Sequence, residues 1–181
     1  IVRATGARGE HEAARERALR RVRQMAMRAG PVVVGPWTGE VGFELLYWAP
    51  FVRWAVRRHR IDPSRLTIVS RGGTASWYGI EGAHYRDVLA LRSPDEFRVR
   101  TEFKKQRTLR AFDRELIRQV AAELGPARPS LLHPALMYAT YMPFWKQQEP
   151  KAWVDTVADR RRVEPPAVPG LDLPRAYVAA R

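Results

Sequence analysis

The stretch PVVVGPWTGEVGFELLYWAPFVRWA, residues 31–55, restricts the possible folds of this chain more than any other segment. It begins with three consecutive valines, Val32 to Val34, and a run of β-branched residues is typical of a strand that is buried on both faces. A glycine-rich turn follows, and apolar residues then recur at helical spacing over residues 43–58, where Pro50 predicts a kink. A buried strand that passes through such a turn into a helix is the first half of a parallel βαβ unit.

Short apolar runs and helical patterns alternate along the rest of the chain. Ser93, followed by Pro94 and by Glu96 three residues after it, is the signature of a helix start. The alternation predicts an α/β fold, a three-layer sandwich with a mainly parallel, Rossmann-like sheet. The expected strands lie at residues 32–34, 66–69, 88–91 and 131–132, and the expected helices at residues 10–29, 43–58, 112–124 and 153–162.

The length of 181 residues suits one domain with a sizeable core. We interpret residues 1–30 as an N-terminal basic helix or linker and residues 31–163 as the Rossmann-like domain. Residues 164–181 begin as a proline-rich linker and end in the apolar run YVAAR. Because this last run is cut short, we expect the chain to be part of a longer protein.

Composition excludes several classes of protein. The chain contains no cysteine, which rules out disulfides and thiolate metal sites, and we expect neither a metal nor a cofactor. No apolar run reaches the roughly 18–20 residues that span a membrane. The arginine-rich start lacks the apolar segment of a signal peptide, so we expect a cytoplasmic protein, with peripheral contact to a membrane as an option.

The net charge of +13 suggests nucleic-acid binding, but the basic residues argue against it. Four of the 32 are lysine and 28 are arginine, a bias that a GC-rich genome also produces. They are spread along the chain, and no recognisable nucleic-acid-binding motif accompanies them. A solvated basic surface explains the charge, and a basic face toward an anionic membrane or an anionic substrate is the alternative that stays open.

Ligands of parallel α/β sheets bind beyond the carboxyl ends of the strands, so the residues that follow the expected strands are the candidates for a site. Each candidate also has a structural explanation, as a solvated arginine, a turn glycine, a core aromatic ring or a strand-end histidine. Glu40 is the candidate catalytic residue. The candidates for substrate binding are Gly39, Gly42, Arg71, Gly72, Gly73, Trp77, Tyr78 and His133.

The acids in the glycine-rich turn decide which ligand this turn suits. No Gly-Lys-Ser/Thr follows the glycines, so the turn is not a P-loop, and Trp37 occupies the first glycine position of a dinucleotide fingerprint. Glu40 and Glu44 place negative charge where a phosphate would bind and would repel a diphosphate. The turn therefore favours a neutral, hydroxyl-bearing ligand, with Glu40 as its proton acceptor. An acid placed to suit the helix dipole is the structural alternative.

The same stretch resembles the first strand, loop and helix of GT-B-fold glycosyltransferases. The lipopolysaccharide heptosyltransferases carry a Gly-Asp-Val turn followed by a proline in the first helix. Gly39, Glu40, Val41 and Pro50 stand at the matching places, with Glu for Asp. In that family the acid of the turn is the proposed general base, so the resemblance assigns this role to Glu40. The final YVAAR resembles the strand that opens the donor-binding half of such enzymes.

The resemblance implies that the chain is the acceptor-binding half of a nucleotide-sugar-dependent glycosyltransferase, inactive as a fragment. A second domain would hold most of the nucleotide-sugar donor, and the acceptor would be a hydroxyl group of a glycan or of a lipid-linked sugar. Arg71, with Gly72 and Gly73, would then reach the leaving diphosphate. Trp77 and Tyr78 would stack on a sugar ring.

Three points stay open at this stage. His133 would be a second base or a further contact to the acceptor. A basic nucleic-acid-binding module is one alternative to the transferase, and it predicts binding that depends steeply on salt. A non-catalytic α/β interaction domain is the other, with the aromatic-rich segment at residues 138–153 as its docking surface.

Overall fold

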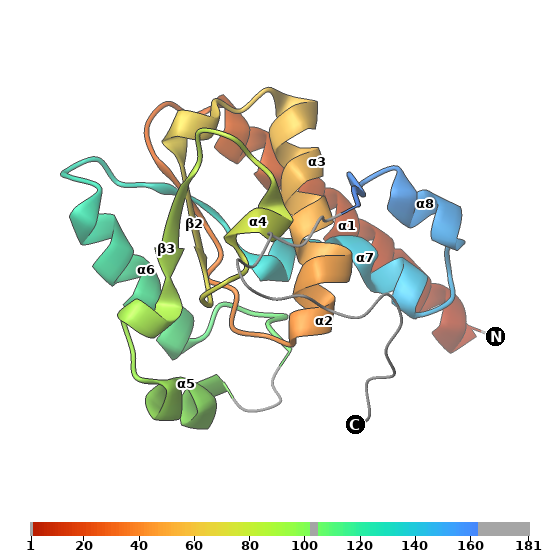
Figure 1. Cartoon of the computed structure of the whole chain (residues 1–181). Helices are drawn as coiled ribbons and strands as arrows, with labels where there is room; N and C mark the ends of the chain where they lie inside the picture. Colours follow the sequence, from red (N-terminus) through yellow and green to blue (C-terminus); the bar gives the residue numbers. More distant parts are fainter. Residues whose placement is uncertain (1, 102–104, 163–181) are drawn as a thin grey trace, which may run out of the picture.

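The chain folds around a four-stranded, all-parallel sheet with the strand order β3-β2-β1-β4. The structure is a computed structural model, and it describes residues 2–101 and 105–162. Helices cover both faces of the sheet, which confirms the predicted three-layer α/β architecture (Figure 1). The strands are β1 (Val32–Val34), β2 (Leu66–Ser70), β3 (His84–Asp87) and β4 (Ser130–Leu132).

The central strand β1 explains why three valines stand in a row. Val32 and Val34 point into the larger core, under α1 (Val2–Met27), α3 (Ala49–His59) and α7 (Pro134–Trp145). Val33 points to the opposite face, where it packs with apolar residues of α6 (Ala111–Glu123). Because successive side chains of a strand alternate between the faces, a strand between two helical layers needs an apolar residue at every position.

The third strand begins four residues before the segment that we predicted. Residues 88–91 were expected to be extended, but β3 ends at Asp87, and Val88–Ala90 form a 3-10 turn. The Asp87 carboxylate starts this turn by accepting the backbone N–H of Leu89 at 2.8 Å. The prediction failed because β3 is an edge strand with the partly polar sequence HYRD, which lacks the apolar signal of a buried strand.

The helix expected over residues 43–58 is interrupted, as Pro50 predicts. A short helix α2 (Val41–Phe43) passes into a π-helical turn (Glu44–Trp48), and α3 begins directly after it. Because Pro50 has no N–H, it cannot bond the carbonyl of Leu46 four residues before it. Arg160 donates to that carbonyl instead, with an Nη1–O distance of 2.9 Å.

The remaining helices follow the sequence signals to different degrees. The cap of α5 (Pro94–Thr101) is as predicted, because Ser93 Oγ accepts the N–H of Glu96 at 3.2 Å. The expected helix at 153–162 is shorter and earlier, α8 (Lys151–Asp155). Helix α1 packs along α7 and contributes Val22 to the main core. The expected linker and strand at 164–181 lie outside the described residues, and within the described part no helix is long and apolar enough to cross a membrane.

Candidate functional site

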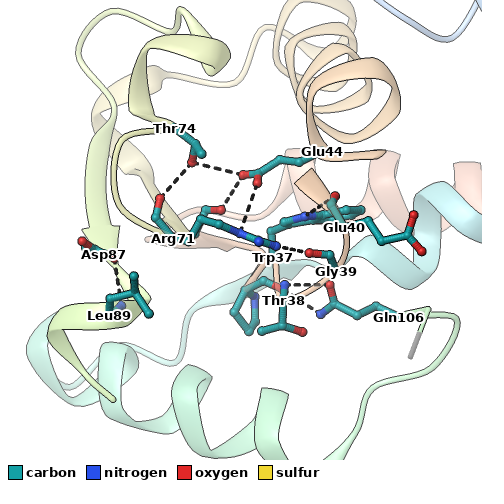
Figure 2. Close-up of polar contacts among 12 residues, drawn as sticks. Trp37, Thr38, Gly39, Glu40, Glu44, Arg71, Thr74, Asp87, Leu89 and Gln106 are labelled. Carbon is teal, nitrogen blue, oxygen red and sulfur yellow. Dashed lines mark hydrogen bonds and ion pairs between the residues drawn. The ribbon is translucent and has the colours of Figure 1, made fainter. Parts of the chain in front are cut away.

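The loops after β1 and β2 meet at the carboxyl edge of the sheet, where Arg71 joins them. The guanidinium of Arg71, the first residue after β2, donates a hydrogen bond to the carbonyl of Gly39 in the glycine-rich turn (Figure 2). Its Nε lies 3.9 Å from Oε2 of Glu44 in the following helix. Arg71 therefore links the turn to the interior and fixes the position of one loop relative to the other.

Glu44 is a fully buried carboxylate that is surrounded by hydroxyl groups. Its Oε1 accepts hydrogen bonds from Ser70, from Tyr78 at 2.7 Å and from Thr74 at 3.2 Å. Thr74 and Tyr85 are themselves hydrogen-bonded, with 2.7 Å between their oxygens. The donors to Glu44 come from β2, from the short helix α4 (Ala75–Tyr78) and from Thr74 just before that helix, so the carboxylate connects its own helical turn to two other elements.

Burial changes the proton affinity of this cluster. Burial raises the pKa of the Glu44 carboxyl above its usual value, although the hydroxyl donors and Arg71 lower it in part. Burial and the neighbouring Glu44 together raise the pKa of the Tyr78 phenol. Because Glu44 has no exposed surface, it cannot touch a ligand, and its role is to hold the Arg71 loop in place.

Glu40, one helical turn before Glu44, is in the opposite situation. It is exposed, and its side chain makes no hydrogen bond or ion pair with another described residue. Its backbone is held instead, since the Trp37 indole N–H donates to the Glu40 carbonyl at 3.2 Å. Figure 2 shows the Glu40 side chain directed away from Arg71. The turn thus presents an accessible carboxylate on a backbone that is fixed by a buried tryptophan.

The glycines of the two loops differ in whether a side chain would fit at their positions. A side chain at Gly72 would place its Cβ 2.7 Å from the carboxylate of Asp87, and Gly73 has a left-handed φ of +81°. At Gly39 a Cβ would lie 3.0 Å from the Trp37 ring. Gly42 is different, because a Cβ there would meet nothing within 4 Å among the described residues. The space above Gly42, two residues after Glu40, is therefore open.

An aromatic surface lies beside the turn. Phe43 has its ring centroid 5.9 Å from that of Trp145 and 6.4 Å from that of Tyr138, and Phe43 and Trp145 are only partly buried. Burial first, and then the negative charge of Glu40, raise the pKa of Tyr138 to about 12. Glu40 lies three residues before Phe43, so the exposed carboxylate belongs to the same segment as the aromatic surface formed by Phe43, Tyr138 and Trp145.

Of three further residues singled out from the sequence, two are buried and one is half-buried. Tyr78 is fully buried, so neither face of its ring is open to a sugar. Trp77 is half-buried and its carbonyl accepts a hydrogen bond from Arg53. His133 is buried after β4, where its Nδ1 accepts the N–H of Ala135 at 3.1 Å. A hydrogen bond joins Arg71 to Gly39 at the carboxyl edge, and Glu40, Gly42, Gly72 and Gly73 lie in the same two segments. Tyr78 and His133 are buried, and Trp77 is half-buried.

Sequence reasoning missed a second buried network that supports the turn from below. Thr38 donates its N–H to Oε1 of Gln106 at 2.9 Å, and the Gln106 amide donates to Asp113 at 3.1 Å. Burial raises the pKa of Asp113, but His133, 3.5 Å away, and the N–H of Arg110 lower it more, so the net pKa lies below the usual value. The available signal was an acid in the first turn of a predicted helix.

Comparisons with known proteins identify no relative of this chain: no protein family, no curated protein and no solved structure matches it. Among the described residues, no group of three or more potential ligands could hold a metal ion.

Proposed function

We propose that this chain is the acceptor-binding domain of a nucleotide-sugar-dependent glycosyltransferase that transfers a sugar to a hydroxyl group. The observation that carries the proposal is the state of Glu40. Of the carboxylates around this edge, Glu44 and Asp113 are buried, and Asp87 is bonded to the N–H of Leu89. Glu40 is exposed on a fixed backbone, which is what a general base for an incoming hydroxyl requires.

The proposed reaction assigns one role to each part of the edge. Glu40 takes the proton of the acceptor hydroxyl. The oxygen of that hydroxyl bonds to the anomeric carbon of the donor sugar, and the bond from that carbon to the nucleoside diphosphate breaks. The partly exposed Arg71 offers positive charge to the departing diphosphate. The rings of Phe43 and Trp145 offer a stacking surface for the acceptor. Such an enzyme would work in the cytoplasm, with its basic surface toward a membrane where the acceptor is lipid-linked.

The rigidity of the Arg71 loop supports this assignment. A positioned charge stabilises a transition state best when no reorganisation is needed at the moment of reaction. The carbonyl of Arg71 accepts a hydrogen bond from Tyr85 at 2.5 Å, and its guanidinium is held by Gly39 and faces Glu44. Close packing of Gly72 on Asp87 restricts the loop further.

The test uses the full-length protein and a pair of glycine variants. Purified protein is incubated with UDP-, GDP- and ADP-linked sugars and a panel of glycan and lipid-linked acceptors, and transfer of labelled sugar is measured. Gly42→Leu fills the open space over the turn and should raise the acceptor KM. Gly9→Leu is the matched control, because a Cβ at Gly9 also meets nothing within 4 Å but lies in α1. Transfer by no donor in the panel, or equal effects of the two variants, would refute the proposal.

A further inference from the structure

A groove lies along the free edge of the sheet, outside the turn that carries Glu40. Its volume is 860 Å³, and its floor is the edge strand β4. The C-terminal part of α1 forms one wall and residues 107–109 form another. This size falls within the range of about 300–1,000 Å³ that is typical of small-molecule sites.

The charge of the groove is of one sign. Four arginines line it, namely Arg21, Arg28, Arg107 and Arg128, and none of the described residues in its lining is acidic. All four side chains are exposed. With low-dielectric protein on its walls, a concave surface of one charge concentrates ions of the opposite charge. The groove is therefore suited to an anion.

An arginine-rich sequence places arginines on every surface, so how the arginines are arranged matters more than how many there are. Several arginines elsewhere meet acids, as where Arg100 binds Glu115 at 2.9 Å and Arg86 binds Glu123 at 3.0 Å, while other exposed arginines have no described ion pair. The groove differs because four arginines line one concave surface. The four groove arginines form no ion pair with another described residue. Their guanidinium groups keep all of their donors for a ligand, and the planar fork of arginine matches the oxygens of a phosphate.

The lining between the arginines is mixed, with the polar side chains of Gln24, Thr108, Ser130 and His133 beside apolar residues. Met25, Leu109 and Leu136 supply apolar surface. Ser130 donates its N–H to the carbonyl of Pro31 at 2.9 Å, toward β1. Because the N–H and C=O groups of successive residues alternate in direction along a strand, both backbone groups of Leu131 point away from β1 toward the free edge of the sheet.

We propose that this groove binds a phosphate monoester that carries an apolar chain, with the phosphate held by the arginines and the chain against the apolar lining. A phosphate monoester carries up to two negative charges and can pair with several arginines at once, whereas a carboxylate carries only one. The groove has both a charged and an apolar part, so inorganic phosphate should bind more weakly than an alkyl phosphate. The proposal does not depend on the transferase activity, because it uses none of the residues at the Glu40 turn.

The experiment compares two double variants of the 181-residue chain by calorimetry with hexyl phosphate. Arg28→Gln/Arg128→Gln removes two charges from the groove and should weaken binding by about 10- to 100-fold, because each charged hydrogen bond contributes strongly. Arg17→Gln/Arg114→Gln removes two exposed arginines outside the groove that also lack ion pairs with described residues. It should change the affinity less than the groove variant does, because neither side chain lines the groove.

Two further arms identify the source of the phosphate. If the ligand is a lipid, the wild-type chain binds vesicles of phosphatidylcholine that contain phosphatidic acid, and the Arg28→Gln/Arg128→Gln variant does not. Binding of hexyl phosphate without vesicle binding indicates a soluble ester. The proposal is overturned if hexyl phosphate shows no saturable binding. It is also overturned if both double variants lose the same affinity, which means a general attraction to the basic surface that a DNA duplex would share.

Discussion

Truncating the buried acid, Glu44→Ala, is the change to which we expect the fold to be most sensitive. The carboxylate is the common acceptor of hydroxyl groups from Ser70, Thr74 and Tyr78, and it faces the guanidinium of Arg71. After truncation Thr74 keeps the carbonyl of Arg71 as an acceptor, at 3.0 Å. Ser70 and Tyr78 lose the acceptor that they have in the native structure, and both are fully buried.

The expected cost follows from these two hydroxyl groups. A buried donor left without its acceptor costs about 1–3 kcal/mol, so two cost about 2–6 kcal/mol. Removing a carboxylate that burial disfavours returns part of this, which favours the lower half of the range, about 2–4 kcal/mol. Against a typical domain stability of about 5–15 kcal/mol, this is a large loss.

A double-mutant cycle with Tyr78→Phe tests the reasoning. Alone, Tyr78→Phe removes a hydrogen bond to a charged acceptor and should cost about 1–3 kcal/mol. Combined with Glu44→Ala it should cost almost nothing, because the hydroxyl that it removes is then already without its acceptor. Free energies of unfolding are measured by urea denaturation, followed by tryptophan fluorescence. If the effects of the two changes are additive, or if Glu44→Ala costs no more than the exposed control Glu40→Ala, the network does not stabilise the fold as we describe.

Three further changes have defined outcomes. Gly35→Ala should cost about 2–4 kcal/mol in urea unfolding, because this residue has φ +108° and a Cβ would lie 2.5 Å from the carbonyl oxygen of Val69. Gly42→Ala should instead stabilise the fold by about 0.5–1 kcal/mol in the same assay, since nothing described blocks a Cβ there. The lowered pKa of Asp113 gives stability that is present above pH 3.8 and is lost as the pH falls through the folded-state pKa. Thermal melts of Asp113→Asn should therefore lose less stability than wild type on acidification.

The sequence was most informative where local chemistry decides the structure. The valine run of β1 predicted a strand buried on both faces because each of its side chains enters a core. Ser93 predicted the start of α5 because a cap depends only on residues within the next turn. Pro50 predicted the break before α3 because a missing N–H acts on the carbonyl four residues earlier. Each of these signals acts over a few residues.

The candidate site depended on distant contacts that no local pattern contains. Glu40 and Glu44 are both acids in the same turn of the sequence, yet one is exposed and the other is buried. What separates them is the position of Ser70 and Tyr78, which lie 26 and 34 residues beyond Glu44 along the chain. The pairing of Asp113 with His133 likewise crosses from α6 to the end of β4. Such pairs follow from the packing of whole elements, so the sequence identified the acids without assigning their roles.

The most direct test of the account is the rate of sugar transfer by full-length Glu40→Gln with saturating donor and acceptor, measured beside a thermal melt. A positioned base contributes about 10²–10⁴-fold, so the turnover rate should fall by that factor while the melt stays unchanged, because the side chain is exposed and has no described partner. Glu81→Gln, an exposed acid in the loop before β3, is the control and should transfer at the wild-type rate. A Glu40→Gln protein that melts normally and transfers sugar as fast as wild type would contradict the central claim that Glu40 is the base.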